Sequence, residues 1–373
     1  MQGPTNKELV ELNWDELHDI STESLVELTP GSENSLKTKK MPPHTDIDAE
    51  LAMKHDFVEQ DDEKPTKASP REYKLILRNC IYLFYLHVAG LYGIYLLLVE
   101  AKWSTVLITS FFHLITLLGV TAGAHRYFSH KSYKATMPLQ IILMLFHSFA
   151  YQKSLIGWVR NHRLHHKYSD TDADPHNASR GFFYSHIGWL MVEPHPEVLK
   201  KRKLLYMDDL YNNPVVMFQH RNASWLLHLL AFIIPTVTSW MWGESLWNSW
   251  FINTYRVMIT SNLSFAGNSV NHLWGCKPYD KTMTAAQNIY FLFLTLGEGF
   301  HNFHHVFPWD YRSGEIGGDK VNIITQFIDI CGKLGLAYDM KTASEDMVKS
   351  RMLRTGDGSD LWGYTDKEKI KNN

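Results

Sequence analysis

Four long apolar stretches constrain the fold of this chain more than any other feature of its sequence. They cover residues 75–99, 104–123, 225–242 and 246–267. A stretch of about 20 apolar residues spans a hydrocarbon layer roughly 30 Å thick, and only a helix or a closed barrel satisfies the backbone hydrogen bonds there. Short turns join the first stretch to the second and the third to the fourth. The sequence therefore predicts an all-α membrane protein with four transmembrane helices in two hairpins.

Basic residues predict how these helices are oriented. The loop between the hairpins, residues 125–222, holds 13 Lys and Arg residues, whereas the two hairpin turns hold one, Lys102. Because cytoplasmic loops carry the excess of positive charge, we expect the termini and the long loop in the cytosol. Residues 137–151 are apolar but too short to span, and predict a helix at the membrane interface. The alternative, buried helices of a soluble protein, fits less well with tryptophans at several ends of the stretches.

The regions outside the apolar stretches predict two tails. Residues 1–70 hold 16 acidic and 7 basic residues with few aromatic ones, a composition typical of disordered segments. Residues 71–340 then form the membrane domain with its cytosolic helical cap, and residues 341–373 form a cytosolic C-terminal tail. The net charge of −2 gives no indication of nucleic-acid binding. Three widely separated cysteines predict neither a disulfide framework nor a cysteine metal site.

The 20 histidines are distributed unevenly. The pattern His-x-x-His-His occurs twice, within NHRLHH (161–166) and as HNFHH (301–305), and HRYFSH and NSVNHLWG each follow a predicted span. Positions i, i+3 and i+4 share one helix face, so each triplet points in one direction. The topology gathers nine imidazoles on the cytosolic side, with Asn268 one turn before the histidine of NSVNHLWG. The nine belong to His125, His130, His162, His165, His166, His272, His301, His304 and His305.

Three imidazoles on one helical face predict a metal site. As imidazolium ions they would repel one another, whereas one metal ion satisfies all three neutral rings. Nine nitrogens exceed what one ion binds; two ions would take four or five each, with Asn268 as a further ligand through water. Imidazole suits iron, copper, nickel and zinc, so ligand type leaves the metal open. Soluble di-iron bundles use Glu and Glu-x-x-His ligands, and without such a motif a di-iron site here would be nearly all nitrogen.

These histidine boxes resemble those of the membrane acyl-CoA desaturases of the stearoyl-CoA desaturase type, and of insect members in particular. The resemblance runs from about residue 72 to residue 340. Further matching segments are TAGAHR (121–126), DADPHNASRGFFYSHIGWL (172–190), CKPYDK (276–281) and GEGFHNFHHVFPWDYR (297–312).

The resemblance implies four transmembrane helices capped by a cytosolic domain that holds two irons. It implies that the nine histidines, with Asn268 acting through water, are the iron ligands and the catalytic residues. The implied reaction is that of a stearoyl-CoA 9-desaturase, in unsaturated fatty acid biosynthesis. It introduces a cis double bond into an acyl-CoA, with O2 as oxidant and electrons from NADH through cytochrome b5 reductase and cytochrome b5. The chain ends KIKNN, which resembles a dilysine signal, so we expect it in the endoplasmic reticulum membrane.

The resemblance also implies where the substrate binds. Gln152, Trp158 and Arg160 match family positions near the chain entry and the thioester. Ser264 and Phe265 occupy the stretch that lines the bend of the acyl tunnel. At position 265 the usual family residue is Trp, so Phe265 is a departure that bears on chain length and on the position of the double bond.

Other departures bear on how coenzyme A is bound. Asn161 replaces a usual Asp and Lys153 a usual Asn, while Glu193 and Pro194 stand where relatives often carry Arg-Lys. The basic run 200–203 either replaces that charge or is a solvated surface run.

Several side chains near the boxes are candidates for supporting roles. A hydrogen-bond acceptor must fix the tautomer of each ligating imidazole. The alternative for the DTDADP turn is that its carboxylates only cap helices. The candidates are Asp170, Asp172, Asp174 and Glu298. For the depth of the tunnel, the candidates by helical reach are Phe112, His113 and Thr116.

Three rival functions share parts of this sequence pattern. A lipid hydroxylase would use the same oxidant and yield an alcohol instead of an alkene. A zinc-dependent membrane hydrolase would work without O2 or reductant, but nine ligands are too many for it. A non-enzymatic lipid or partner binder has no need to keep all nine histidines.

Overall fold

The computed structural model describes residues 72–314 and 322–360. The predicted acidic tail and the KIKNN ending lie outside these residues. Within them the regular secondary structure is almost wholly helical, which confirms the predicted helical fold. A small sheet pairs β1 (Lys134–Ala135) with β2 (Ala337–Tyr338) in antiparallel register.

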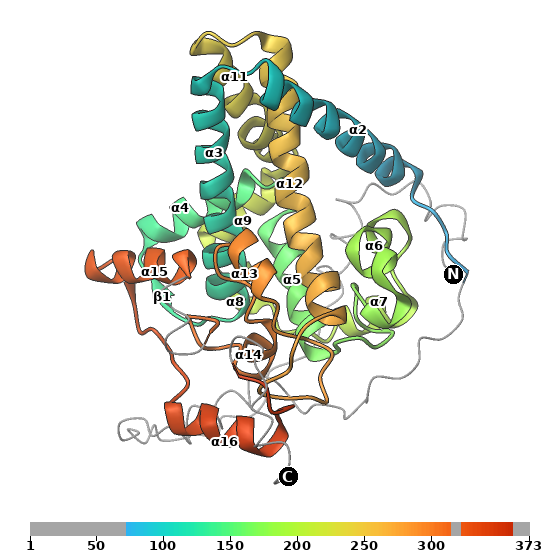
Figure 1. Cartoon of the computed structure of the whole chain (residues 1–373), viewed down its shortest axis with the longest axis vertical. Helices are drawn as coiled ribbons and strands as arrows, with labels where there is room; N and C mark the ends of the chain where they lie inside the picture. The colour runs from blue at the N-terminus through green and yellow to red at the C-terminus, as the bar shows by residue number, and fades with distance from the viewer. Residues whose placement is uncertain (1–71, 315–321, 361–373) are drawn as a thin grey trace, which may run out of the picture. The chain divides into compact units, whose positions relative to one another are not determined.

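Among the described residues, three helical segments are long and apolar enough to cross a membrane: Leu77–Val99, Trp103–Ser129 and Ala223–Met241. They correspond to α2 (Leu77–Val99), to α3 (Trp103–Leu118) continued by η2 (Gly119–Ser129), and to α10 (Ala223–His228), η5 (Leu229–Ile233) and α11 (Ile234–Met241). α3 runs beside the long helix α12 (Leu246–Leu273), and α2 also packs on α12 (Figure 1).

The fourth predicted span, α12, has 28 residues but is not among the three candidate spans. The reason is that its inward face is polar. Arg256 is 1% exposed and donates to Thr116 and to the backbone oxygens of Phe149 and Ala231. Asn253 accepts from the same guanidinium and donates to the Ala231 oxygen. These side chains are hydrogen-bonded inside the protein, so they lower the mean hydropathy without facing lipid.

The second span changes from an α-helix to a π-helix at η2. Gly119 begins this segment, and a Cβ placed there would lie 2.1 Å from the backbone nitrogen of His147. Glycine therefore allows η2 to press against α4 (Met137–Ser148). Wider π turns are frequently found at functional sites, and this one carries His125 into the site described below.

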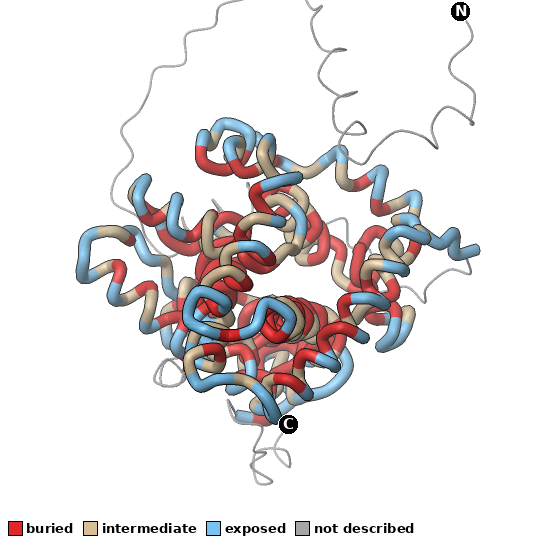
Figure 2. The backbone as a smooth tube through the Cα atoms, turned by 90° about the horizontal axis from the view of Figure 1, so that it is seen from above, coloured by how far each residue is buried: buried red, intermediate tan, exposed pale blue. Residues whose placement is uncertain are grey.

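The remaining helices cover the histidine-bearing end of the bundle. α5 (Leu155–Lys167) is preceded by Ser154, whose Oγ accepts from the backbone nitrogen of Gly157, a typical N-cap. Buried residues gather inside this arrangement and exposed ones outside (Figure 2). The other helices outside the spans are η3 (Ala178–Arg180), η4 (Tyr184–Gly188), α6 (Trp189–Met191), α7 (Pro196–Arg202), α8 (Asp208–Tyr211), α9 (Pro214–Arg221), α13 (Ile289–Leu294), α14 (His301–Val306), α15 (Ile323–Lys333) and α16 (Glu345–Thr355).

Candidate metal centre and substrate cavity

The nine predicted histidine ligands lie together at one end of the helical bundle. Their nitrogens form two groups, and within each group the candidate ligand atoms lie within 4.8 Å of one another. The first group comprises His125, His130, His162, His166 and His304. The second comprises His165, His272, His301 and His305.

Both helices that bear the repeated motif contribute to both groups. On α5, His165 joins the second group, whereas His162 and His166 join the first. On α14, the middle histidine of the motif joins the first group and the outer two join the second. The rings of His166 and His305 stack with centroids 4.1 Å apart, so the two groups are direct neighbours.

Within each group the imidazoles approach one another through their Nε2 atoms. Donors that bind one ion at right angles through bonds of about 2.1 Å lie about 3 Å apart, so this spacing suits an ion between them. Six such Nε2 pairs lie 2.8–3.2 Å apart: His125–His304, His130–His162, His166–His304, His165–His272, His272–His301 and His301–His305.

Two carboxylates of the DTDADP turn accept hydrogen bonds from the Nδ1 atoms of two histidines of the second group. Asp174 Oδ2 accepts from His165 Nδ1 at 2.9 Å, and Asp170 Oδ2 accepts from His272 Nδ1 at 3.0 Å. Asp172, in the same turn, pairs with Arg180 at 2.6 Å instead. A neutral imidazole that donates through Nδ1 presents a lone pair at Nε2. The Nε2 atoms of His165 and His272, 3.2 Å apart, would then repel each other, and a metal cation between them removes that repulsion.

Glu298 has the same role at the first group. Its Oε2 lies 2.8 Å from His125 Nδ1, and its Oε1 accepts from Arg126 at 2.6 Å. Arg126 is 1% exposed and also donates to Thr325 and Asn322 around the start of α15. The buried charge of Glu298 is thus compensated, as a buried carboxylate requires.

The electrostatics favour neutral imidazoles at His162, His301 and His304 and an ionised carboxylate at Glu298, whereas burial of His165 is outweighed by Asp174 and Asp170, which raise its pKa. Burial, reinforced by the neighbouring rings, lowers the pKa of His162, His301 and His304 well below the ordinary value. Burial alone would raise the pKa of Glu298, but Arg126 and His125 outweigh it and hold that pKa below its usual range. Neutral imidazoles supported by carboxylates are the form that binds a metal ion, so the donor set fits two ions.

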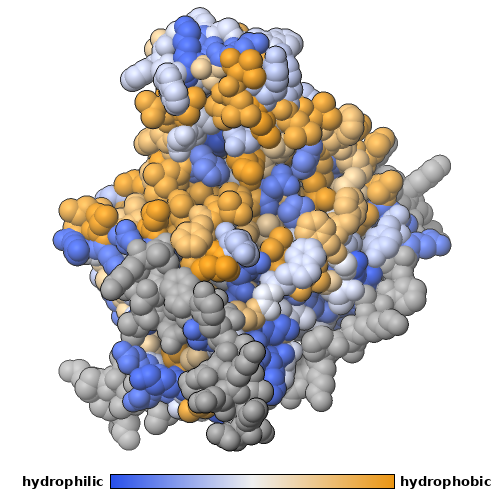
Figure 3. All heavy atoms as spheres, in the orientation of Figure 1, coloured by the Kyte–Doolittle hydropathy of each residue, from blue (hydrophilic) through white to orange (hydrophobic). Residues whose placement is uncertain are grey.

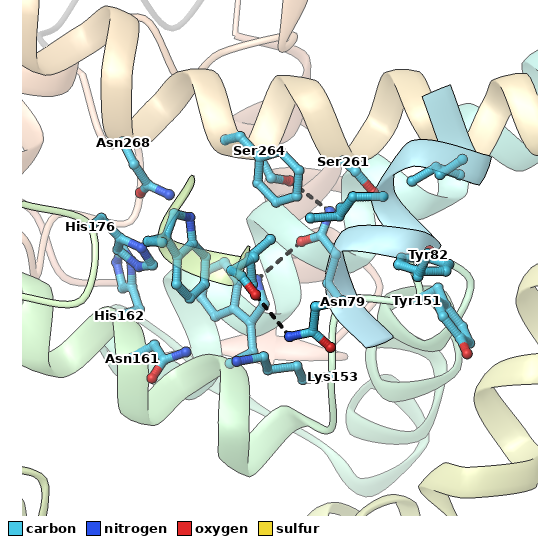
Figure 4. A pocket seen from close by; sticks show the side chains of 17 residues that line it. Asn79, Tyr82, Tyr151, Lys153, Asn161, His162, His176, Ser261, Ser264 and Asn268 are labelled. Atoms are coloured by element: carbon cyan, nitrogen blue, oxygen red, sulfur yellow. Dashed lines mark hydrogen bonds between the residues drawn. The ribbon is translucent and has the colours of Figure 1, made fainter. Parts of the chain in front are cut away.

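A cavity of about 210 Å³ leads to the first histidine group. Its wall is formed by α2, the loop before α5, α5, α6 and α12, and apolar side chains supply most of it. His162 and Asn268 lie at one end, whereas Asn79, Tyr82 and Tyr151 lie toward the other (Figure 4). A second, smaller cavity shares Asn268 and reaches His125 and His301.

Four of the five predicted substrate contacts line this cavity. Gln152 donates to Ser264 Oγ at 2.9 Å and accepts from Trp158 Nε1 at 3.2 Å (Figure 4). The Trp158 ring stacks on His162 with centroids 5.0 Å apart. Phe265 lies in the same wall. The bridge through Gln152 therefore fixes the cavity wall relative to a candidate metal ligand.

Arg160, the fifth predicted contact, does not line the cavity. Two side chains that do line it, His176 and Trp189, were not singled out from the sequence. Their rings meet edge to face, 4.2 Å apart, and His176 Nδ1 and Trp189 Nε1 are buried without a hydrogen-bond partner in the described residues. Both residues lie in the segment DADPHNASRGFFYSHIGWL, which the sequence analysis gave as a family match without assigning a site to it.

The other candidates for substrate contacts have mixed positions. In the basic run 200–203, Lys200 and Lys203 are exposed, whereas Lys201 is buried against Tyr168 and Arg202 donates to Asn161. Part of the run is therefore structural. The three residues proposed for tunnel depth line neither cavity: Phe112, His113 and Thr116.

Comparisons with known proteins decide the family. The family model described as fatty acid desaturase matches residues 101–313, which include all nine histidines. The chain belongs to the fatty acid desaturase family. It is 52% identical over 305 residues to the acyl-CoA Delta(11) desaturase of Trichoplusia ni, covering 81% of this chain and 87% of that protein.

Other relatives of this desaturase chain carry different names. It is 51% identical to the (11Z)-hexadec-11-enoyl-CoA conjugase of Bombyx mori, over 79% of this chain and 89% of that protein. It is 45% identical to the acyl-CoA Delta-9 desaturase of Acheta domesticus, over 82% of this chain and 86% of that protein. The family is thus clear, whereas the named positions of the double bond differ among relatives.

Proposed function

We propose that this chain is an acyl-CoA desaturase that introduces a cis double bond into a fatty acyl chain, in unsaturated fatty acid biosynthesis. The observation that carries the proposal is the pair of histidine groups at the end of an apolar cavity, in a chain of this family. The reaction converts a –CH2–CH2– unit, O2, two electrons and two protons into –CH=CH– and two waters.

In this proposal each histidine group would hold one iron. The five nitrogens of the first group would bind the first iron. The four nitrogens of the second group would bind the second, with Asn268 as a further ligand through water. When bound, the irons activate O2 into an oxidant strong enough to remove hydrogen from an unactivated methylene. Imidazole ligands are neutral and leave the charge of the metal uncompensated, which alters the potential of that oxidant.

The residues of the chain position the substrate and the ligands. Asp170, Asp174 and Glu298 keep their histidines in the tautomer that presents Nε2. Trp158 is held by its hydrogen bond to Gln152 and stacks on His162. It forms part of the wall along which the acyl chain lies. The apolar cavity excludes water and holds the methylenes at a fixed distance from the histidine groups.

The partners follow from the same proposal. The substrate is an acyl chain carried on coenzyme A, and Arg160, a charged neighbour of the lining residue Lys153, supplies positive charge for its polar end. The two electrons come from NADH through cytochrome b5 reductase and cytochrome b5. A stearoyl-CoA 9-desaturase is the activity implied by the sequence, and the names of the relatives make position 11 the alternative to be tested.

Residues 71–340 form the membrane domain in this proposal, with an acidic tail before it and a short tail after it. α12 is its fourth span and pairs with Ala223–Met241 as the second hairpin. At about 1.5 Å per residue, the 28 residues of α12 are long enough to cross the bilayer and carry His272 beyond it. The basic loop places the histidines and both termini in the cytosol, and the protein resides in the endoplasmic reticulum membrane.

Expression in desaturase-deficient yeast tests the function directly. We expect growth without added unsaturated fatty acid, and new cis alkenes whose position mass spectrometry assigns. Hydroxylated products would indicate the hydroxylase instead. Metal analysis of the purified protein should give two irons per chain, and activity should require O2. Zinc in place of iron, with activity independent of O2, would refute the proposal.

A further inference from the structure

Helix α15 has apolar side chains on two different faces. One face packs into the main core, where Ile324 is fully buried and Ile328 is 1% exposed. The second face points outward, with Ile323 43%, Ile330 55% and Leu334 68% exposed. Phe327 lies between them and is partly buried. We call this second face the α15 stripe: Ile323, Phe327, Ile330 and Leu334.

The α15 stripe is distinct from the polar face of the helix. Its members repeat at i, i+4, i+7 and i+11, the spacing of one helical face. With about 3.6 residues per turn, the stripe lies roughly a quarter turn from the buried face. It lies about as far, in the other direction, from Gln326, Asp329 and Lys333. An ordinary surface helix buries its one apolar stripe and exposes a polar face, so a second exposed stripe calls for an apolar neighbour.

The position of α15 indicates which neighbour this is. β1 and β2 pair, and the Thr136 nitrogen donates to the Leu336 oxygen at 2.9 Å, so the end of α15 is tied to the start of α4. α15 also packs on η2, the end of the second candidate span. α4 itself exposes apolar residues on the same rim: Met137 48%, Ile141 41% and Ile142 37%.

The surface view agrees with this placement. The exposed apolar surface of the spans continues to the left edge of the molecule, where α15 lies in Figure 1, and hydrophilic atoms lie directly beneath it (Figure 3). The stripe is therefore continuous with the surface that faces lipid.

We propose that α15 lies in the membrane interface, with the α15 stripe in the acyl layer and Lys333 toward the headgroups. Helices with one apolar face and charged flanks bind bilayers in this orientation. The proposal does not depend on the reaction that the chain performs. It gives the protein a lipid contact far along the chain from its spans, through a helix that follows the last histidine box.

This lipid contact also supports the metal centre. Asn322 caps α15 by accepting from the Thr325 nitrogen, and both side chains accept from Arg126. Arg126 in turn holds Glu298, which holds His125. Lipid at the stripe thus anchors the helix that completes the support of the first histidine group.

Site-specific fluorescence on the full chain tests the proposal. Leu334→Cys and Ile330→Cys are labelled with a small fluorophore, in a background with Cys80→Ser, Cys276→Ser and Cys331→Ala. The protein is placed in nanodiscs of phosphatidylcholine and phosphatidylserine. The matched control is Lys333→Cys, one residue away on the polar face. Quenchers are lipids with a nitroxide on the acyl chain and, separately, iodide in the buffer.

We expect the nitroxide lipid to quench labels at positions 330 and 334 and to spare position 333, with the opposite pattern for iodide. Equal quenching of all three labels by iodide would overturn the proposal, since the stripe would then face water. Protection of positions 330 and 334 from both quenchers would also overturn it, in favour of a protein partner or a second copy. If either variant fails to fold, as judged by size-exclusion chromatography, Ile323→Cys provides another stripe position.

Discussion

Replacing Asp170 with asparagine tests how the second histidine group is organised. Asp170 Oδ1 accepts from the Ala178 nitrogen at 2.6 Å, and Oδ2 accepts from His272 Nδ1 at 3.0 Å. In Asp170→Asn the amide oxygen keeps the first bond, but the amide NH2 then faces His272 Nδ1. His272 responds by moving its proton to Nε2, which removes a lone pair from the group.

Loss of such a partner typically weakens metal binding by about 10- to 100-fold, or about 1.4 to 2.8 kcal/mol. We expect the purified variant to lose iron from the second group first, so that the metal content falls from two toward one per chain. Desaturation in yeast should fall with it. Elemental analysis at a series of chelator concentrations measures the affinity.

The matched control is Asp172→Asn in the same turn, because Asp172 pairs with Arg180 rather than with one of the nine histidines. It should keep both irons. The reasoning is refuted if Asp170→Asn retains two irons at the chelator concentration that strips neither from the parent protein. Equal losses in the two variants would show a general weakening of the turn instead.

Two further outcomes are expected. His165→Ala should abolish desaturation while the protein still inserts into microsomal membranes; activity that survives would contradict a ligand role. Phe265→Trp fills part of the cavity and should shift chain-length or positional preference, and an unchanged product profile by mass spectrometry would remove Phe265 from the wall that selects substrate.

The sequence predicted most of the helical fold because its signals are local. Runs of apolar residues marked the three candidate spans to within a few residues, except that the second extends to Ser129. α12 was harder to judge, since a polar face buried against neighbouring helices cannot be distinguished by composition from one facing water. The π-helix η2 was not predicted, because the close approach that Gly119 allows depends on where α4 packs.

For the candidate site, too, the sequence predicted the local features but not those that depend on packing. The spacing of the two His-x-x-His-His motifs predicted that each triplet would share one helix face, and the positions of all four histidine segments after the spans predicted that nine imidazoles would gather. The assignment of His165 and His166 to different groups was not predictable, because it depends on how α5 and α14 cross. Likewise, sequence proximity could not distinguish Asp170 and Asp174, which face histidines, from Asp172, which faces Arg180. The structure indicates these roles through contacts between distant segments.

The cavity wall and the metal centre share α5 and α12, but α2, α6 and the loop before α5 contribute to the wall and carry none of the nine histidines. Of the nine histidines only His162 lines the larger cavity, and α5 adds Trp158 and Asn161 to the same wall. Substitutions in the parts without ligands can therefore shift the acyl chain relative to the metal site without removing a ligand. Such a division of labour gives a physical reason why proteins 45% to 52% identical to this chain bear names with different double-bond positions.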